Sequence, residues 1–132
     1  MAETSVPLSA AQAEKVERFL IAHRRIVADF ARSLENARHF LNLAERALER
    51  EPGNTLTLLS QIREIDLLGH LSRQFEEFQA VAGALPPQGN AEAPAQARRV
   101  ETTRSRYEDL IREAESQLAV MDRLQAALSH PH

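Results

Sequence analysis

Histidines paired with acidic residues are the side chains of this chain most suited to metal or acid–base chemistry. Two of the five histidines follow an acidic residue four positions earlier, as Glu35–His39 and Asp66–His70, so each pair could share one helix face. Di-iron helical bundles instead use a Glu-x-x-His motif on two helices, with two further glutamates. Because the spacing here differs, the sequence favours hydrogen-bonded surface pairs, and we expect neither a metal nor a cofactor.

His23 differs from the other histidines because it lies on a line of apolar residues that repeats every seven positions. A histidine on such a line is expected to be buried and satisfied by a neighbouring helix. Two further roles are open. A polar residue in a coiled-coil seam can fix the register of the helices, and a histidine can act as a pH switch near neutrality.

Residues for nucleophilic catalysis are missing from the sequence. The chain has no cysteine, which excludes disulfides, zinc–thiolate sites and cysteine nucleophiles and fits a reducing compartment. The glycines Gly69 and Gly83 are isolated, so no phosphate-binding loop is indicated. The mid-helix serines lack a nucleophile elbow and an assignable base; they are Ser33, Ser60, Ser72 and Ser116. We therefore expect a protein that is not an enzyme.

Arginines crowd the start of the last predicted helix and are the best candidates for binding an anionic ligand or an acidic partner. They are Arg98, Arg99, Arg104, Arg106 and Arg112. Acidic residues interleave with them at spacings of three or four, which also fits a solvated, salt-bridged face. The net charge of −3 and the pI near 6.0 disfavour nucleic acid as the partner.

The elements that must position these residues are long amphipathic helices. Residues 9–50 contain no proline or glycine and carry three adjacent lines of mostly apolar residues with a seven-residue repeat. Such a repeat favours a left-handed supercoil against partner helices. The lines are Val16, His23, Phe30, Ala37 and Ala44; Phe19, Ile26, Ser33, Phe40 and Ala47; and Leu20, Val27, Leu34, Leu41 and Leu48.

Prolines and glycines divide the rest of the chain. Pro52 and Gly53 end the first helix, and Asn54 is the expected N-cap of the second. Gly69 indicates either close packing of a neighbouring helix or a hinge. We predict an all-α, elongated, antiparallel three-helix bundle with up-down-up topology and left-handed coiled-coil packing. The predicted segments are a disordered lead at 1–8, helices at about 9–50, 55–84 and 94–128, and a linker at 85–93.

The first predicted helix is about ten residues longer than the second, so its N-terminal turns are expected to overhang the bundle. The apolar residues Val16, Phe19, Leu20 and Ile21 would then be uncovered. Exposed contiguous apolar surface usually marks an interface. We therefore expect helix 1 to bind a protein partner or a second copy of the chain. The alternative is that the third helix, which is also long, covers these residues.

The pattern resembles a spectrin-type repeat over about residues 27–127. Phe30 and Phe40 lie ten positions apart, like the usual aromatic pair of that repeat's first helix. The segment Arg106-Tyr107-Glu108-Asp109-Leu110 looks like the arginine–aromatic–acidic–acidic–leucine segment of its third helix. The chain departs from the family in its extended first helix and in having Phe40 and Tyr107 where tryptophans are typical. The resemblance implies a three-helix coiled-coil module that acts as a structural spacer or docking surface.

Together these features predict a non-enzymatic helical protein–protein interaction module, a small structural or adaptor subunit of a larger assembly. One alternative is a ligand- or metal-binding regulatory bundle, and another is an RNA-associated subunit that uses the arginines of the third helix. No stretch reaches the ~18 apolar residues of a membrane span. The N-terminus lacks the features of a secretory signal, so we expect a cytoplasmic location and no membrane partner.

Overall fold

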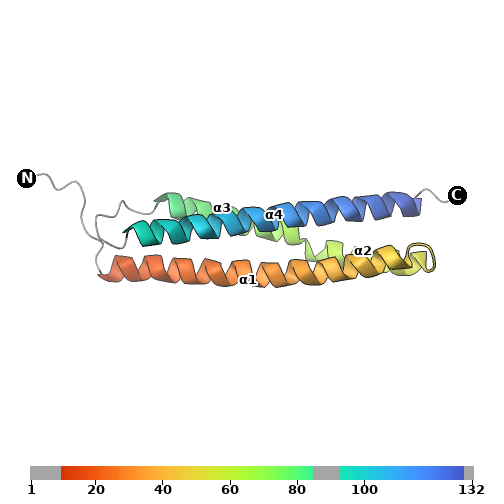
Figure 1. Ribbon diagram of the computed structural model, residues 1–132, viewed down its shortest axis with the longest axis horizontal. Coiled ribbons are helices and arrows are strands. Elements are labelled where there is room, and N and C mark those ends of the chain that lie inside the picture. Colours follow the sequence, from red (N-terminus) through yellow and green to blue (C-terminus); the bar gives the residue numbers. More distant parts are fainter. Residues whose placement is uncertain (1–9, 85–92, 130–132) are drawn as a thin grey trace, which may run out of the picture.

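The computed structural model describes residues 10–84 and 93–129, in which four α-helices account for the regular structure (Figure 1). They are α1 (Ala10–Ala47), α2 (Pro52–Ile65), α3 (Leu67–Ala84) and α4 (Ala93–Ser129). No strand occurs within these two ranges, which confirms the prediction of an all-α chain. The predicted lead at 1–8, the Ser9 cap and residues 85–92 of the predicted linker lie outside the described residues.

The helices α1 and α4 run in the same direction, and α2 and α3 return in the opposite direction (Figure 1). Side-chain contacts between the helices agree with these directions. Glu17 and His23 of α1 meet Arg99 and Tyr107 of α4, so positions increase together along the two helices. By contrast, Phe78 of α3 lies against the N-terminal half of α1, whereas α2 begins beside its C-terminal end. The result is an elongated molecule in which the apolar side of α1 is covered along its length by α4 and by α3 and α2 in turn (Figure 1).

The turn between α1 and α2 places the start of α2 earlier than predicted. Pro52 is at the start of α2, where its fixed φ suits the first helical turn and its missing N–H costs nothing. Asn54 therefore lies inside the helix, and the prediction that it caps a helix beginning at Thr55 is wrong. The buried Thr55 hydroxyl donates instead to the Ala44 carbonyl at 2.7 Å, which ties α2 to the end of α1.

The prediction of a single helix at 55–84 is also wrong, because that segment breaks at Asp66. Asp66 has φ 50° and ψ 52°, the left-handed conformation that asparagine and aspartate tolerate better than most residues. Its N–H donates to the Arg63 carbonyl, and its carboxylate accepts from the Gly69 N–H at 3.3 Å. Asp66 thus ends α2 and caps α3. A Cβ at Gly69 would overlap the Asp66 carboxylate, so this glycine accommodates the cap rather than a neighbouring helix.

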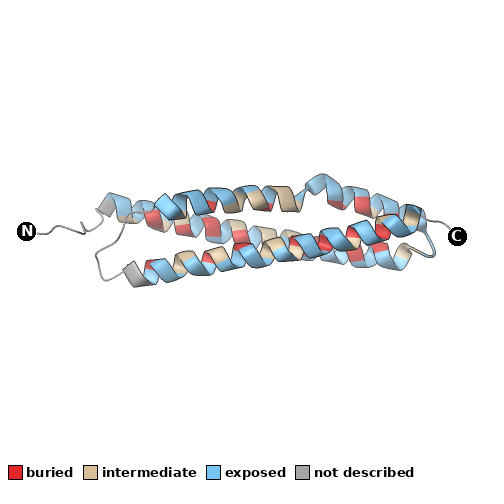
Figure 2. Cartoon of the chain, turned by 90° about the horizontal axis from the view of Figure 1, so that it is seen from above, coloured by how far each residue is buried: buried red, intermediate tan, exposed pale blue. Residues whose placement is uncertain are grey.

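Most of the buried apolar residues form two clusters, one on each side of this break, and buried positions run along all four helices (Figure 2). The predicted apolar stripe of α1 contributes to both, and its leucine line is buried as expected: Leu34 is 2% exposed and Leu41 is 4% exposed. The cluster near the α1–α2 turn contains Ala37, Leu41, Ala44, Leu59, Ile62, Met121 and Leu124. The cluster on the α3 side of the break contains Val27, Leu34, Leu71, Phe78, Tyr107 and Ala114. Of the predicted aromatic pair, Phe30 is half-buried and Phe40 is exposed.

The predicted overhang of the first helix is wrong. Val16 is 4% exposed and Leu20 is 2% exposed, so both belong to the core. Phe19 is half-buried and stacks on Phe78 of α3, with ring centroids 5.3 Å apart. Only Ile21 of the predicted set faces solvent. The reason is that the end of α3 and the start of α4 reach the beginning of α1 and cover it, as the alternative interpretation anticipated.

Candidate functional site

A basic cleft lies between the first halves of α1 and α4 and has a volume of about 230 Å³. Three arginine side chains and two threonine side chains line it above two aliphatic residues. The lining residues are Leu20, Arg24, Val27, Arg99, Thr102, Thr103 and Arg106. We call this feature the basic cleft. It combines cationic groups, hydroxyl groups and an apolar floor within one small concavity.

A buried contact between α1 and α4 sets the geometry of the basic cleft. The Tyr107 hydroxyl lies 2.7 Å from Nδ1 of His23. Arg24 directly follows His23 in the sequence, and Arg106 directly precedes Tyr107. The contact therefore fixes the register in which these two arginines, from helices far apart in sequence, come to line the same cleft.

The arginines of the basic cleft differ in their partners. Arg99 forms a two-pronged ion pair with Glu17, with N–O distances of 2.8 and 2.5 Å. This hydrogen bonding lowers the pKa of the Glu17 carboxyl and raises the pKa of the Arg99 guanidinium. Among the residues that the structure describes, neither Arg24 nor Arg106 makes an ion pair. The cleft thus holds two positive charges that are not neutralised by a direct carboxylate contact.

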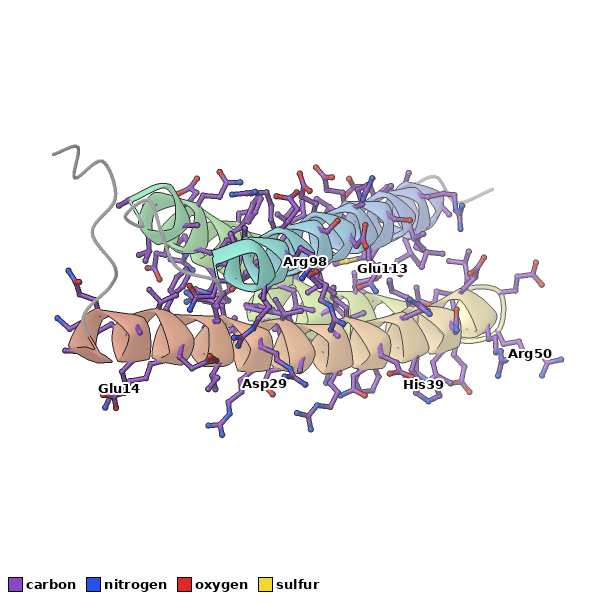
Figure 3. All side chains as sticks on the ribbon, turned by 60° about the vertical axis from the view of Figure 1, so that its left-hand side comes forward. Glu14, Asp29, His39, Arg50, Arg98 and Glu113 are labelled. Carbon is purple, nitrogen blue, oxygen red and sulfur yellow. The ribbon has the colours of Figure 1, made fainter. Side chains whose placement is uncertain are left out.

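The other arginines predicted at the start of the third helix do not reach the basic cleft. Arg104 pairs with Glu101 and Arg112 pairs with Asp109, each on the surface of α4 itself. Arg98 is exposed near the start of α4 and is not among the cleft residues (Figure 3). The structure therefore brings Arg99 and Arg106 together and separates them from the rest. The sequence did not indicate Arg24, Thr102 or Thr103 as cleft residues, since their meeting depends on how α1 and α4 are paired.

His23 and Tyr107, the sequence neighbours of Arg24 and Arg106, form the polar centre of an aromatic cluster. His23 is 9% exposed, and its ring lies 4.8 Å from Phe19 and 5.2 Å from Phe78, measured between centroids. Burial lowers the pKa of His23, against an opposing effect of the Glu77 charge. Burial also raises the pKa of Tyr107 to about 12. His23 is therefore neutral at pH 7, and the Tyr107 hydroxyl can donate to it. The expectation of a buried, satisfied histidine is confirmed.

The lowered pKa of His23 predicts that the fold loses stability in mild acid. The unfolded chain takes up a proton on this histidine below about pH 6.5, whereas the folded chain resists it to lower pH. Unfolding is therefore favoured as the pH falls below that value. We expect the melting temperature of the wild type to drop between about pH 7.5 and 5.5, as thermal denaturation followed by circular dichroism would show.

The double variant His23→Leu/Tyr107→Phe, which leaves neither group unpaired, should lose most of this pH dependence. The exposed His39 provides the matched control, since His39→Gln should keep the pH dependence of the melting temperature. If the melting temperature depended equally on pH in the wild type and the double variant, or did not depend on pH in either, His23 would not couple pH to stability.

The remaining described histidines are on the surface. His39 points away from the bundle on the side of α1 opposite α4 (Figure 3). The ring of His70 contacts Arg73 at 2.7 Å, not the side chain of Asp66, so the expected pairing with that carboxylate is wrong. No group of three or more histidine, cysteine or acidic side chains is arranged to hold a metal in residues 10–84 and 93–129. Over the same ranges, none of the helices contains an apolar stretch that could span a bilayer.

Comparison of the chain with models of known protein families, with curated proteins and with solved structures found no match. The resemblance to a spectrin-type repeat therefore stays a prediction.

Proposed function

We propose that this protein is a non-enzymatic helical interaction module, a small structural or adaptor subunit, which binds an acidic segment of a protein partner in the basic cleft. The observation that carries the proposal is the pair Arg24 and Arg106, which line one concavity without carboxylate partners. Guanidinium groups bind carboxylates through two parallel hydrogen bonds, a geometry that suits glutamate and aspartate side chains. The Thr102 hydroxyl, at the edge of the same cleft, adds a donor.

A protein segment fits the basic cleft better than a nucleic acid does. Duplex and single-stranded nucleic acids bind along extended basic surfaces, whereas this chain has a net charge of −3 and alternates acidic and basic residues along α4. The cleft holds only about 230 Å³, which is room for one or two side chains rather than a run of nucleotides. Its floor of Leu20 and Val27 suits an aliphatic group beside the carboxylates.

The proposed module has the finer architecture that the heptad repeats predict. The module consists of three rods in up-down-up order: α1 is the first, α2 followed by α3 is the second, and α4 is the third. The rods wind around one another with a left-handed twist, as in spectrin-type spacers. Support comes from the buried seven-residue lines of α1 and from the shared direction of α1 and α4. In this arrangement the partner contacts α1 through Arg24 and not through Val16, Phe19 or Leu20, which the bundle itself covers.

The test is binding of a fluorescently labelled peptide of glutamates and leucines, followed by anisotropy. The wild type should bind it with an affinity that weakens as salt is raised, and a lysine–leucine peptide should not bind. Tighter binding of single-stranded RNA than of the acidic peptide would replace the proposal with the RNA-associated alternative. Association of the chain with itself in sedimentation, without peptide binding, would favour the homo-oligomer.

Release of Arg99 from its partner should strengthen peptide binding. In Glu17→Gln, the guanidinium loses its carboxylate and a third charge becomes available in the basic cleft. The pair is more than two-fifths exposed on both sides, so its strength is at most about 1 kcal/mol, and we expect about three- to fivefold tighter binding.

Glu14→Gln is the matched control for this experiment. It makes the same charge change on the same helix and frees Arg18, which does not line the cleft. It should therefore alter peptide affinity much less than Glu17→Gln does. Equal increases in peptide affinity in the two variants would show that net charge, not the cleft, governs binding.

A further inference from the structure

A second and larger cavity, of about 410 Å³, opens where the rod formed by α2 and α3 is broken. Its wall comes from all four helices. Leu34 of α1, Leu67 of α3 and Met121 of α4 supply apolar surface, and Arg63, Asp66 and Gln117 supply polar groups. The volume falls within the range of about 300–1,000 Å³ that is usual for small-molecule sites.

The chain's own geometry creates this cavity. At Asp66 the backbone leaves the helical path and starts again as α3, so the second rod does not fill the space beside α1 and α4 continuously. The nearby wall residues Gly69 and Ala114 are small and do not refill it. The cavity therefore lies at the junction of the two buried clusters, where leucine and methionine side chains from both are within its wall.

Three of the four polar side chains of the wall already have partners within the chain, and the fourth, Ser72, carries an uncharged hydroxyl. The Gln117 amide donates to the Leu34 carbonyl at 2.8 Å, and the Arg63 guanidinium contacts the Asp122 carboxylate at 3.2 Å. The Asp66 carboxylate caps α3. A charged ligand would have to displace these contacts, whereas an apolar one would bury the aliphatic wall without disturbing them. The class of ligand is thereby restricted to uncharged, mainly apolar molecules.

We propose that this cavity is a binding site for one uncharged, mainly apolar small molecule. The site shares no residue with the basic cleft and binds a ligand of different chemistry. It does not depend on the proposed function, and each proposal can fail while the other stands.

The probe for the test is N-phenyl-1-naphthylamine, an uncharged aromatic amine whose fluorescence rises in an apolar site. We expect saturable binding to the wild-type protein with one probe per chain. Ser72→Leu should weaken binding at least tenfold, because it places an apolar side chain in the cavity from α3. Ala114→Leu fills the same space from α4 and should have the same effect.

Ser60→Leu is the matched control, since Ser60 is exposed on α2 and does not line the cavity. It should bind the probe as the wild type does. Circular dichroism identifies any variant that fails to fold, and the second filling variant keeps the test decisive in that event. Absence of saturable binding to the wild type, or equal loss in Ser60→Leu and the filling variants, would overturn the proposal.

Discussion

Leu20→Glu is expected to unfold the protein, whereas Ile21→Glu, one position along the same helix, is expected to leave it folded. Leu20 is 2% exposed within the helical core, and Ile21 is 42% exposed. A glutamate at position 20 would place an ionisable group among apolar side chains, at a cost of several kcal/mol. Domains of this size are stable by only about 5–15 kcal/mol, so that cost is a large share of the total.

Urea denaturation followed by far-ultraviolet circular dichroism measures the effect. Leu20→Glu should lose its cooperative transition or show it at much lower urea, and Ile21→Glu should change the free energy of unfolding by no more than about 0.5 kcal/mol. The neighbouring position is a control with the same charge and the same loss of an aliphatic side chain. Retention of full stability in Leu20→Glu would contradict the covered position of the start of α1.

Charge reversal in the basic cleft is expected to have the largest effect on binding. Arg24→Glu/Arg106→Glu replaces both unpaired cleft arginines with carboxylates, which repel an acidic segment and leave the apolar floor intact. We expect the acidic peptide to bind at least tenfold more weakly, since each close charge pair at an interface contributes at least about 1 kcal/mol.

Arg25→Glu/Arg98→Glu is the control for net charge. Both arginines are exposed, one on α1 and one on α4, and neither lines the basic cleft. Each double reversal replaces two positive charges with two negative ones, which takes the formal net charge from −3 to −7. Peptide affinity, measured by anisotropy at near-physiological salt, should fall less in the control, because neither Arg25 nor Arg98 lines the cleft in which the peptide carboxylates are expected to pair. Similar losses in the two double variants would show that the whole surface, not the cleft, attracts the peptide.

The helical architecture could be predicted because its signal is distributed over many residues. The seven-residue lines of α1 agree with the observed burial along almost the whole helix. The break in the second rod was missed because its signal is a single residue. Asp66 lies in a stretch that is otherwise periodic, and only its left-handed backbone reveals that it ends one helix and caps the next. Gly69 was visible in the sequence, but it accompanies the break and does not cause it.

The candidate site could be predicted only in part, because a site between two helices depends on their register. Arg99 and Arg106 stood out as part of a dense run in the sequence, but nothing near Arg24 showed that it would join them. Helix lengths alone predict an interface at the apolar start of α1. They do not show where the other helices begin and end, and Phe78 of α3 and Tyr107 of α4 reach this region.

The central claim is that the protein binds an acidic segment in the basic cleft, and NMR tests it most directly. The acidic peptide would be titrated into the ¹⁵N-labelled wild type while the backbone amides and the arginine Nε–H groups are observed. We expect saturable shifts centred on Arg24, Arg99, Thr102 and Arg106, with the Nε–H signals of Arg25 and Arg112 unmoved. Shifts centred on other parts of the surface, or no shifts at peptide concentrations that saturate anisotropy, would contradict the central claim.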